Sequence, residues 1–223
     1  MFSQFLRQAT IIGSVALAAC GFGVAFAEES RLMIGQFSTG SLEDWQKKSF
    51  SGETSYAIET VSGVKALQAI SDRSASGLYR KRRVDLTRTP YLNWSWRVDK
   101  PLDKIDEQSK SGDDYAARVY VVIDGGWAFW RTRAVNYVWA SNSPKGKIWP
   151  NAFAGDHAMM LALRSADDAK SLWFHEKRNI FEDLRQLLGE PITAIDAVAI
   201  MTDTDNAGGR AIAYYGDIYF TTD

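Results

Sequence analysis

The segment MTDTDNAGGRA, residues 201–211, brings two carboxylates two positions apart next to an amide and a pair of glycines. Asp203, Asp205 and Asn206 offer hard oxygen atoms of the kind that calcium ions bind. The segment is not an EF-hand loop, because Ala207 stands where that loop has a further acidic ligand. Three interpretations stay open: a hairpin turn rich in Asp, Asn and Gly, a ligand- or metal-binding lip, or a pair of catalytic acids.

Arg118 lies in the middle of the apolar run YAARVYVV. A guanidinium buried in such a run needs a carboxylate partner or a polar ligand, because an unpaired charge is costly to bury. Asp113 and Asp114 begin the same predicted strand, and one of them could be that partner. They are not expected to act together as glycosidase acids, because neighbouring residues of a strand point to opposite faces. The sequence therefore predicts either an internal salt bridge or a ligand site at Arg118.

Aromatic residues make up 13% of the chain, and eight of them are tryptophans. Trp96 and Trp139 lie in predicted strands, and several such rings are needed to fill the core. Trp127 and Trp149 lie beside Gly or Pro, so these two are expected to be the more exposed. Flat aromatic faces can stack on sugar rings, which makes the tryptophans candidates for saccharide binding. The candidate ligand-binding residues are Trp96, Asp113, Asp114, Arg118, Trp127, Trp139, Asp203 and Asp205.

Several common catalytic signatures are absent from the sequence. There is no G-x-S-x-G nucleophile elbow and no GK[ST] phosphate loop. In HEKRN, Asn179 stands where a zincin motif needs its second histidine, so His175 is expected to be a partly buried strand residue. The net charge of −1 gives no general attraction to nucleic acid.

The elements that must position these residues are mostly strands. YLNWSWRV places Leu92, Trp94, Trp96 and Val98 on one face, and the same period of two recurs along the chain. About ten strands with turn residues between them predict an antiparallel β-sandwich or jelly roll. The predicted strands are 55–61, 65–71, 77–86, 91–98, 113–124, 133–140, 157–165, 171–178, 194–202 and 210–222.

One helix is predicted, in the segment NIFEDLRQLLGEP. Asn179 suits the N-cap, with Glu182 three residues later as its capping-box partner. Gly189 suits the left-handed position after the last turn, and Pro191 prevents continuation. The helix, over about 180–188, is expected to cover one end of the sandwich.

The first 27 residues predict a secretory signal peptide, because Arg7 precedes an apolar stretch that ends in small residues at Ala27. Cleavage there would leave a single domain, residues 28–223, with no cysteine and a periplasmic location. The alternative is a lipid anchor at Cys20, which ends the lipobox-like LAAC. No membrane span is expected in the mature form.

Several segments resemble a family of exported bacterial proteins known only as a domain of unknown function. They are SLEDW, ASGLYRKRRVDLTRTPYLNWSWRV, SGDDYAARVYVV, YVWAS, AIMTDTDNAGG and YYGDI, which span about Phe37 to Phe220. The resemblance implies one domain in the cell envelope and assigns no catalytic residues. A looser similarity is to the galactose-binding-like jelly roll of carbohydrate-binding modules, where a first strand such as IGQFSTGSLEDW lies beside a closing strand such as GDIYF. That similarity implies a structural calcium, with Asp217 as its candidate ligand.

These features predict an exported envelope protein that binds a glycan or other saccharide without catalysis. The first alternative is a glycan hydrolase or lyase, because sugar cleavage needs only two placed carboxylates. Its candidates are Asp113, Asp114, Glu176, Asp203 and Asp205. The second alternative is a structural or assembly protein of the envelope. The candidate metal ligands are Asp203, Asp205, Asn206 and Asp217.

Overall fold

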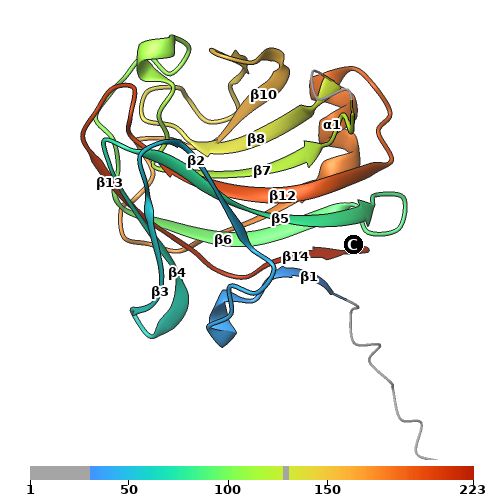
Figure 1. Ribbon diagram of the computed structural model, residues 1–223, viewed down its shortest axis with the longest axis horizontal. Helices are drawn as coiled ribbons and strands as arrows, with labels where there is room; N and C mark the ends of the chain where they lie inside the picture. Colours follow the sequence, from blue (N-terminus) through green and yellow to red (C-terminus); the bar gives the residue numbers. More distant parts are fainter. Residues whose placement is uncertain (1–30, 128–130) are drawn as a thin grey trace, which may run out of the picture.

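The computed structural model describes residues 31–127 and 131–223 (Figure 1). The predicted signal peptide and Cys20 lie outside the described residues. Among the residues that are described, no helix is long and apolar enough to cross a bilayer.

Two seven-stranded sheets form the molecule. Sheet A contains, in spatial order, β1 (Leu32–Gly35), β14 (Ile218–Thr221), β6 (Tyr91–Lys100), β13 (Arg210–Tyr215), β4 (Val64–Asp72) and β3 (Ser55–Val61), with β11 (Phe174–Asn179) paired to β6. Sheet B contains β2 (Gln46–Ser51), β5 (Ala75–Asp85), β12 (Ala194–Asp203), β7 (Ala117–Ile123), β8 (Arg133–Trp139), β10 (Gly155–Arg164) and β9 (Ile148–Asn151). Figure 1 shows β5, β12, β7 and β8 running side by side.

The predicted β-sandwich is confirmed, and most predicted strands are present within a few residues of their expected ends. Two strands were missed: β2 is exposed along its whole length and shows no alternation, and β9 has only four residues. The predicted strand 210–222 is two strands, because Gly216 and Asp217 interrupt it between β13 and β14. The sheets are also not purely antiparallel, since β8 and β10 pair in parallel.

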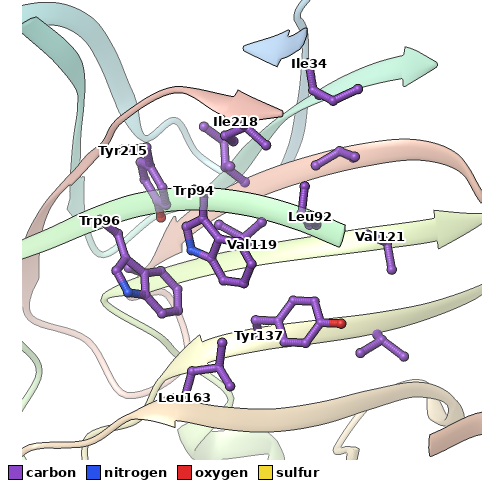
Figure 2. Close-up of a cluster of buried hydrophobic side chains, with 14 of the residues drawn as sticks. Ile34, Leu92, Trp94, Trp96, Val119, Val121, Tyr137, Leu163, Tyr215 and Ile218 are labelled. Carbon is purple, nitrogen blue, oxygen red and sulfur yellow. The ribbon is translucent and has the colours of Figure 1, made fainter. Parts of the chain in front are cut away.

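The core lies between the two sheets and follows from the period of two. On β6, Leu92, Trp94 and Trp96 point inward and are buried, whereas Asn93 and Ser95 point outward. Figure 2 shows these inward side chains of sheet A meeting Val119, Val121, Tyr137 and Leu163 of sheet B. Trp94 and Trp96 pack edge to face, with ring centroids 5.5 Å apart.

The first and last strands lie side by side, as the similarity to carbohydrate-binding modules implied. Leu32 of β1 pairs with Phe220 of β14. Phe37, in the 3-10 turn Phe37–Thr39 (η1) that follows β1, is fully buried in the core. The N-terminal and C-terminal segments therefore close the same edge of sheet A.

The predicted helix is confirmed as α1 (Ile180–Leu188). The Asn179 side chain accepts a hydrogen bond from the Glu182 amide at 3.2 Å, and Gly189 adopts φ of 74° after the last turn. The Glu182 side chain does not complete a capping box, because it pairs with Arg185 instead. The buried Ile180 and Leu184 fix the helix against the core, at one end of the sandwich (Figure 1).

A long connection between β6 and β7, residues 101–116, folds over the outer face of sheet B. Glu107 in this connection is buried, and its carboxylate accepts hydrogen bonds from the amides of Ser141, Asn142 (3.1 Å) and Ser143 (3.0 Å). A second apolar cluster, separate from the main core, holds the connection down; its members are Tyr115, Val138, Ala140, Trp149, Met160 and Ala162. The connection, packed against Trp149 of β9, thus forms a wall over part of the outer face of sheet B.

Candidate ligand-binding pocket

A pocket of about 440 Å³ lies on the outer face of sheet B, beside this wall. Such a volume is within the range of small-molecule sites. Every strand of sheet B contributes to the lining, so the pocket crosses the sheet from the β2 edge to the β9 edge. The lining residues are Phe50, Ala75, Asp113, Arg118, Tyr120, Ala134, Asn136, Asn151, Phe153, Ala158, Met201, Asp203, Asp205 and Asn206.

Strand alternation and register explain why these residues meet. On β7, Val119 and Val121 point into the core, so Arg118 and Tyr120 point out. The antiparallel register places Arg118 opposite Met201 of β12, and Tyr120 opposite Asn136 of β8. Small side chains such as Ala75, Ala134 and Ala158 at other outward positions leave the space open.

Arg118 forms a buried ion pair with Asp203, whose carboxylate contacts the guanidinium Nη2. Asp203 also accepts a hydrogen bond from the Tyr115 amide at 3.2 Å, and the guanidinium lies over the Tyr115 ring at 4.6 Å. The predicted salt bridge is confirmed, but its partner is Asp203 rather than Asp113 or Asp114. Burial raises the pKa of Asp203 to about 7, and the adjacent guanidinium opposes that rise.

Asp113 is buried in the pocket wall and forms no ion pair with any residue that the structure describes. Its carboxylate accepts from the Asn151 side-chain amide, at 2.9 and 2.8 Å to the two oxygens. Burial raises the pKa of Asp113, while Arg118 nearby and the Asn151 hydrogen bond oppose the rise. The residue precedes β7 instead of beginning it, as does Asp114.

The segment that follows Asp203 is not a hairpin turn. It carries the chain from β12 in sheet B to β13 in sheet A, and those strands do not pair with each other. The buried Asp114 holds it by accepting hydrogen bonds from the amides of Asn206 (3.1 Å) and Ala207 (2.6 Å). Gly208 and Gly209 both have positive φ, 81° and 93°, which explains the glycine pair. The segment is therefore a fixed crossover at the edge of the pocket.

Three carboxylates converge where this crossover meets the pocket. One oxygen each of Asp114, Asp203 and Asp205 lies within 4.8 Å of the others. Asn206 joins this cluster, donating its amide to Asp114 at 3.2 Å and to Asp205 at 3.1 Å. Asp217 does not: it accepts from the amide and hydroxyl of Ser38, at 2.8 and 2.6 Å, and lines a different depression. The four candidate metal ligands therefore do not form one site.

The tryptophans chosen as ligand contacts need correction. Trp96 and Trp139 are buried in the core, with Trp96 donating to Glu176 at 3.0 Å, so neither lines the pocket. Trp149, expected to be exposed, is buried in the second apolar cluster. Trp127 is 90% exposed, as expected, but it does not line the pocket.

The exposed rings of the pocket are phenylalanines that sequence reasoning missed. Phe50 is 63% exposed on the edge strand β2, and Phe153 is 58% exposed in the turn after β9. Both lie close to turn residues, in SFSGE and PNAFAG, which is the signal that was applied only to tryptophans. The two rings mark opposite edges of the pocket.

Several polar groups face the pocket without a hydrogen-bond partner among the described residues. Arg118 Nη1 makes no hydrogen bond to a described residue, whereas Arg118 Nε is likewise unpartnered but is buried away from the pocket. The side chains of Tyr120 and Asn136 line the pocket and likewise make no hydrogen bond to any residue that the structure describes. Such groups are normally satisfied by a ligand or by water.

The expected acid pairs for glycan cleavage are arranged unfavourably. Glu176 is remote from the pocket and forms an ion pair with Arg164 at 2.6 Å. Asp114 is fully buried beneath the crossover, and Asp203 is bound to Arg118. His175 is an exposed residue of β11 rather than a partly buried one, and it lies outside this pocket.

The chain belongs to the family described as "Protein of unknown function (DUF3047)", whose model matches residues 43–219. This confirms the resemblance drawn from the sequence. A search of curated proteins finds no match.

Among solved structures, the chain is similar to the family 30 carbohydrate-binding module of a Clostridium thermocellum cellulosomal cellulase. The identity is 12%, the TM-score 0.49, and the match covers 87% of this chain and 98% of the module. It is also similar to the family 11 module of a cellulase from the same organism, with 10% identity, a TM-score of 0.47 and coverage of 87% and 96%. A third similar structure is the K2 cleaved adhesin domain of Lys-gingipain, with 13% identity, a TM-score of 0.44 and coverage of 86% and 99%.

Proposed function

We propose that this protein binds a saccharide, without chemical turnover, in the pocket on the outer face of sheet B. The observation that carries the proposal is the composition of that pocket. It joins exposed aromatic rings at its two edges to unpartnered polar groups on its floor.

A saccharide suits both features. The C–H faces of a sugar ring are apolar and pack on aromatic rings, here those of Phe50 and Phe153. Its hydroxyl groups both donate and accept hydrogen bonds, so one ligand would accept from the unpartnered Arg118 Nη1 and donate to the carboxylate of Asp113. The strands hold these groups in place, which lowers the entropic cost of binding.

A binding role is favoured over hydrolysis by the state of the carboxylates. Of the three that line the pocket, Asp203 is already bound to Arg118 and Asp113 to Asn151. The usual two-acid mechanism needs two carboxyl groups on opposite sides of the bond to be cleaved. The Asp114, Asp203 and Asp205 carboxylates gather instead at one corner of the pocket.

The proposal includes export to the periplasm, with a lipid anchor at Cys20 as the alternative. Its support is the composition of residues 1–27. The mass of the N-terminal peptide of the protein purified from its native membrane and periplasmic fractions distinguishes the two. A start at Glu28 supports soluble export, and a diacylated Cys20 supports the anchor.

The test of binding is a thermal-shift screen of residues 28–223 against a panel of glycans, followed by calorimetry. A ligand that binds only the folded state raises the melting temperature. We expect at least one glycan to do so, and we expect the Phe50→Ala/Phe153→Ala variant to weaken its binding about tenfold. The matched control is Leu172→Ala, an exposed apolar residue outside the pocket. A panel without any hit, or equal affinity in the double variant, contradicts the proposal.

A further inference from the structure

The charge of the pocket is unbalanced. Three carboxylates line it, those of Asp113, Asp203 and Asp205, against the single guanidinium of Arg118. Asp114 lies directly beneath and adds a fourth carboxylate within reach of two of them. The whole chain has a net charge of only −1, so this excess is a local feature.

The excess belongs to carboxylates that have no cationic partner. Arg118 Nη2 is engaged by Asp203. Asp113 is held by the neutral amide of Asn151, and Asp205 by the neutral amide of Asn206 at 3.1 Å. Neither Asp113 nor Asp205 forms an ion pair with any residue in the described part of the chain. Asp113 and Asp205 are therefore the two carboxylates of the pocket that could pair with a positively charged group of a ligand.

We propose that the saccharide bound in this pocket carries a protonated primary amine, as in a non-acetylated amino sugar, and that Asp113 and Asp205 select it. This inference rests on the proposed function and adds the chemical class of the ligand. The ammonium would donate to the two unpaired carboxylates, while the ring would pack on the flanking phenylalanines. Arg118 Nη1, which makes no hydrogen bond to any described residue, would donate to a ring or hydroxyl oxygen of the sugar.

The electrostatics of the empty pocket agree with this assignment. Burial raises the pKa of Asp113, and burial together with the Asp114 charge raises that of Asp205. Both groups are therefore less stable as anions here than they are in water. A cation between them would reverse that cost, whereas a uronic acid or a phosphorylated sugar would increase it.

A saccharide amine fits better than a bare metal ion or a polyamine. The cluster of Asp114, Asp203 and Asp205 is already filled by backbone and side-chain donors, including the Ala207 amide and Arg118. A polyamine would use the carboxylates but would leave the two exposed rings and the Arg118 Nη1 donor without a partner.

The test is calorimetry on residues 28–223 with matched sets of sugars on glucose, galactose and mannose backbones. Each set contains the parent sugar, its 2-amino form and its N-acetylated form, as monosaccharide and as oligomer where one exists. We expect the 2-amino form of at least one backbone to bind about tenfold more tightly than its parent and its N-acetylated form. Added salt should reduce that preference.

Variants assign the preference to the pocket. In Asp113→Asn and Asp205→Asn, the affinity for the 2-amino sugar should fall toward the affinity for the parent sugar. Binding of the parent sugar itself should persist. Asp44→Asn, an exposed carboxylate outside the pocket, is the matched control and should keep the preference for the 2-amino sugar. Each variant's melting temperature is measured alongside, so that a loss of fold is not mistaken for a loss of selectivity.

Three results would overturn the inference. Equal or tighter binding of the parent or acetylated sugars would leave saccharide binding intact and remove the amine. Tighter binding of spermidine or of calcium ions alone would show that the pocket takes a simple cation. Failure of every sugar to bind would remove the proposed function and this inference with it.

Discussion

The two outer faces of the sandwich each carry a depression, and the charged residues that line the two depressions differ in burial. The pocket on sheet B, about 440 Å³, has an acidic floor with buried Asp113, Arg118 and Asp203. The groove on sheet A, about 370 Å³, is lined by the exposed Lys65, His175 and Lys177, beside Asn93, Ser95, Asp217 and Tyr219, and by Glu176, which is paired with Arg164. Both sheets have seven strands, so we attribute the difference in burial to the segments that cover each sheet.

Sheet B is covered at one side by the connection 101–116, which packs on its outer face through Tyr115 and Glu107. In the groove of sheet A, Lys65, His175 and Lys177 are exposed and form no ion pair with described residues. Charges cost little to keep in water and much to bury. Keeping the charges of sheet B buried therefore costs free energy, and the proposed ligand would offset part of that cost when it binds.

The largest expected effect is that of Asp203→Asn on stability. The change leaves Arg118 buried without its partner, which should cost about 3–5 kcal/mol of unfolding free energy. Chemical denaturation at about pH 8, above the pKa of about 7 that burial gives Asp203, measures it. Adding Arg118→Met should recover part of the loss. A cost equal to that of Lys177→Ala on the other face, within about 0.5 kcal/mol of zero, would erase the contrast.

The second effect concerns the wall itself. Glu107→Ala removes the acceptor of three backbone amides and should cost about 1.5–3 kcal/mol, because hydrogen bonds to a charged group are strong. Glu182→Ala, which loses only an exposed pair with Arg185, should cost less than about 0.5 kcal/mol. Hydrogen exchange at residues 141–143 should accelerate in the first variant. Unchanged exchange there would mean that Glu107 does not hold the wall.

The third effect is a pH dependence of the sheet B pocket. The pKa of Asp113 is raised in the folded state, so over the interval above 3.8 the native state holds a proton that the unfolded state has released. Its contribution to stability therefore falls as pH rises through that interval. The melting temperature of Asp113→Asn, relative to the unmodified protein, should increase from about pH 4 to about pH 8. A flat difference would contradict the burial of Asp113 as a carboxylate.

The smallest expected effect is none at all. Lys65→Ala and Lys177→Ala should change both the melting temperature and the saccharide affinity by less than the Phe50→Ala/Phe153→Ala variant does, with affinity within about twofold of the original. Calorimetry with the same glycan checks this. A loss of binding comparable to that of the phenylalanine variant would move the saccharide site to sheet A.

Sequence patterns predicted the sandwich because alternation and turn residues are local signals, and the Asn179 cap and Gly189 stop of the helix are equally local. The partners across the fold were beyond reach. Asp203 and Arg118 are 85 positions apart, and their ion pair depends on the β7–β12 register. The segment after Asp203 has the composition of a hairpin turn. It is instead a crossover between the two sheets, and Asp114, which belongs to the connection 101–116, holds it by accepting from its backbone amides.

The aromatic residues show the limit most clearly. Trp96 and Trp139 were chosen because flat aromatic faces can stack on sugar rings, yet large rings also fill a sandwich core, and these two do so. Phe50 and Phe153 could be placed in the pocket only once the strand order put β2 and β9 at opposite edges of sheet B. For Arg118, by contrast, the predicted internal salt bridge is present, although its partner is Asp203 and not Asp113 or Asp114.

The most direct test of saccharide binding on sheet B is backbone chemical-shift mapping with the tightest glycan of the screen. Amides of Arg118, Tyr120, Asn136 and Asp205 should shift with ligand concentration, and those of Asn93, Ser95 and Lys177 should not. Shifts confined to the groove of sheet A, or no localised shifts despite measurable binding, would contradict the assignment of the site to the pocket.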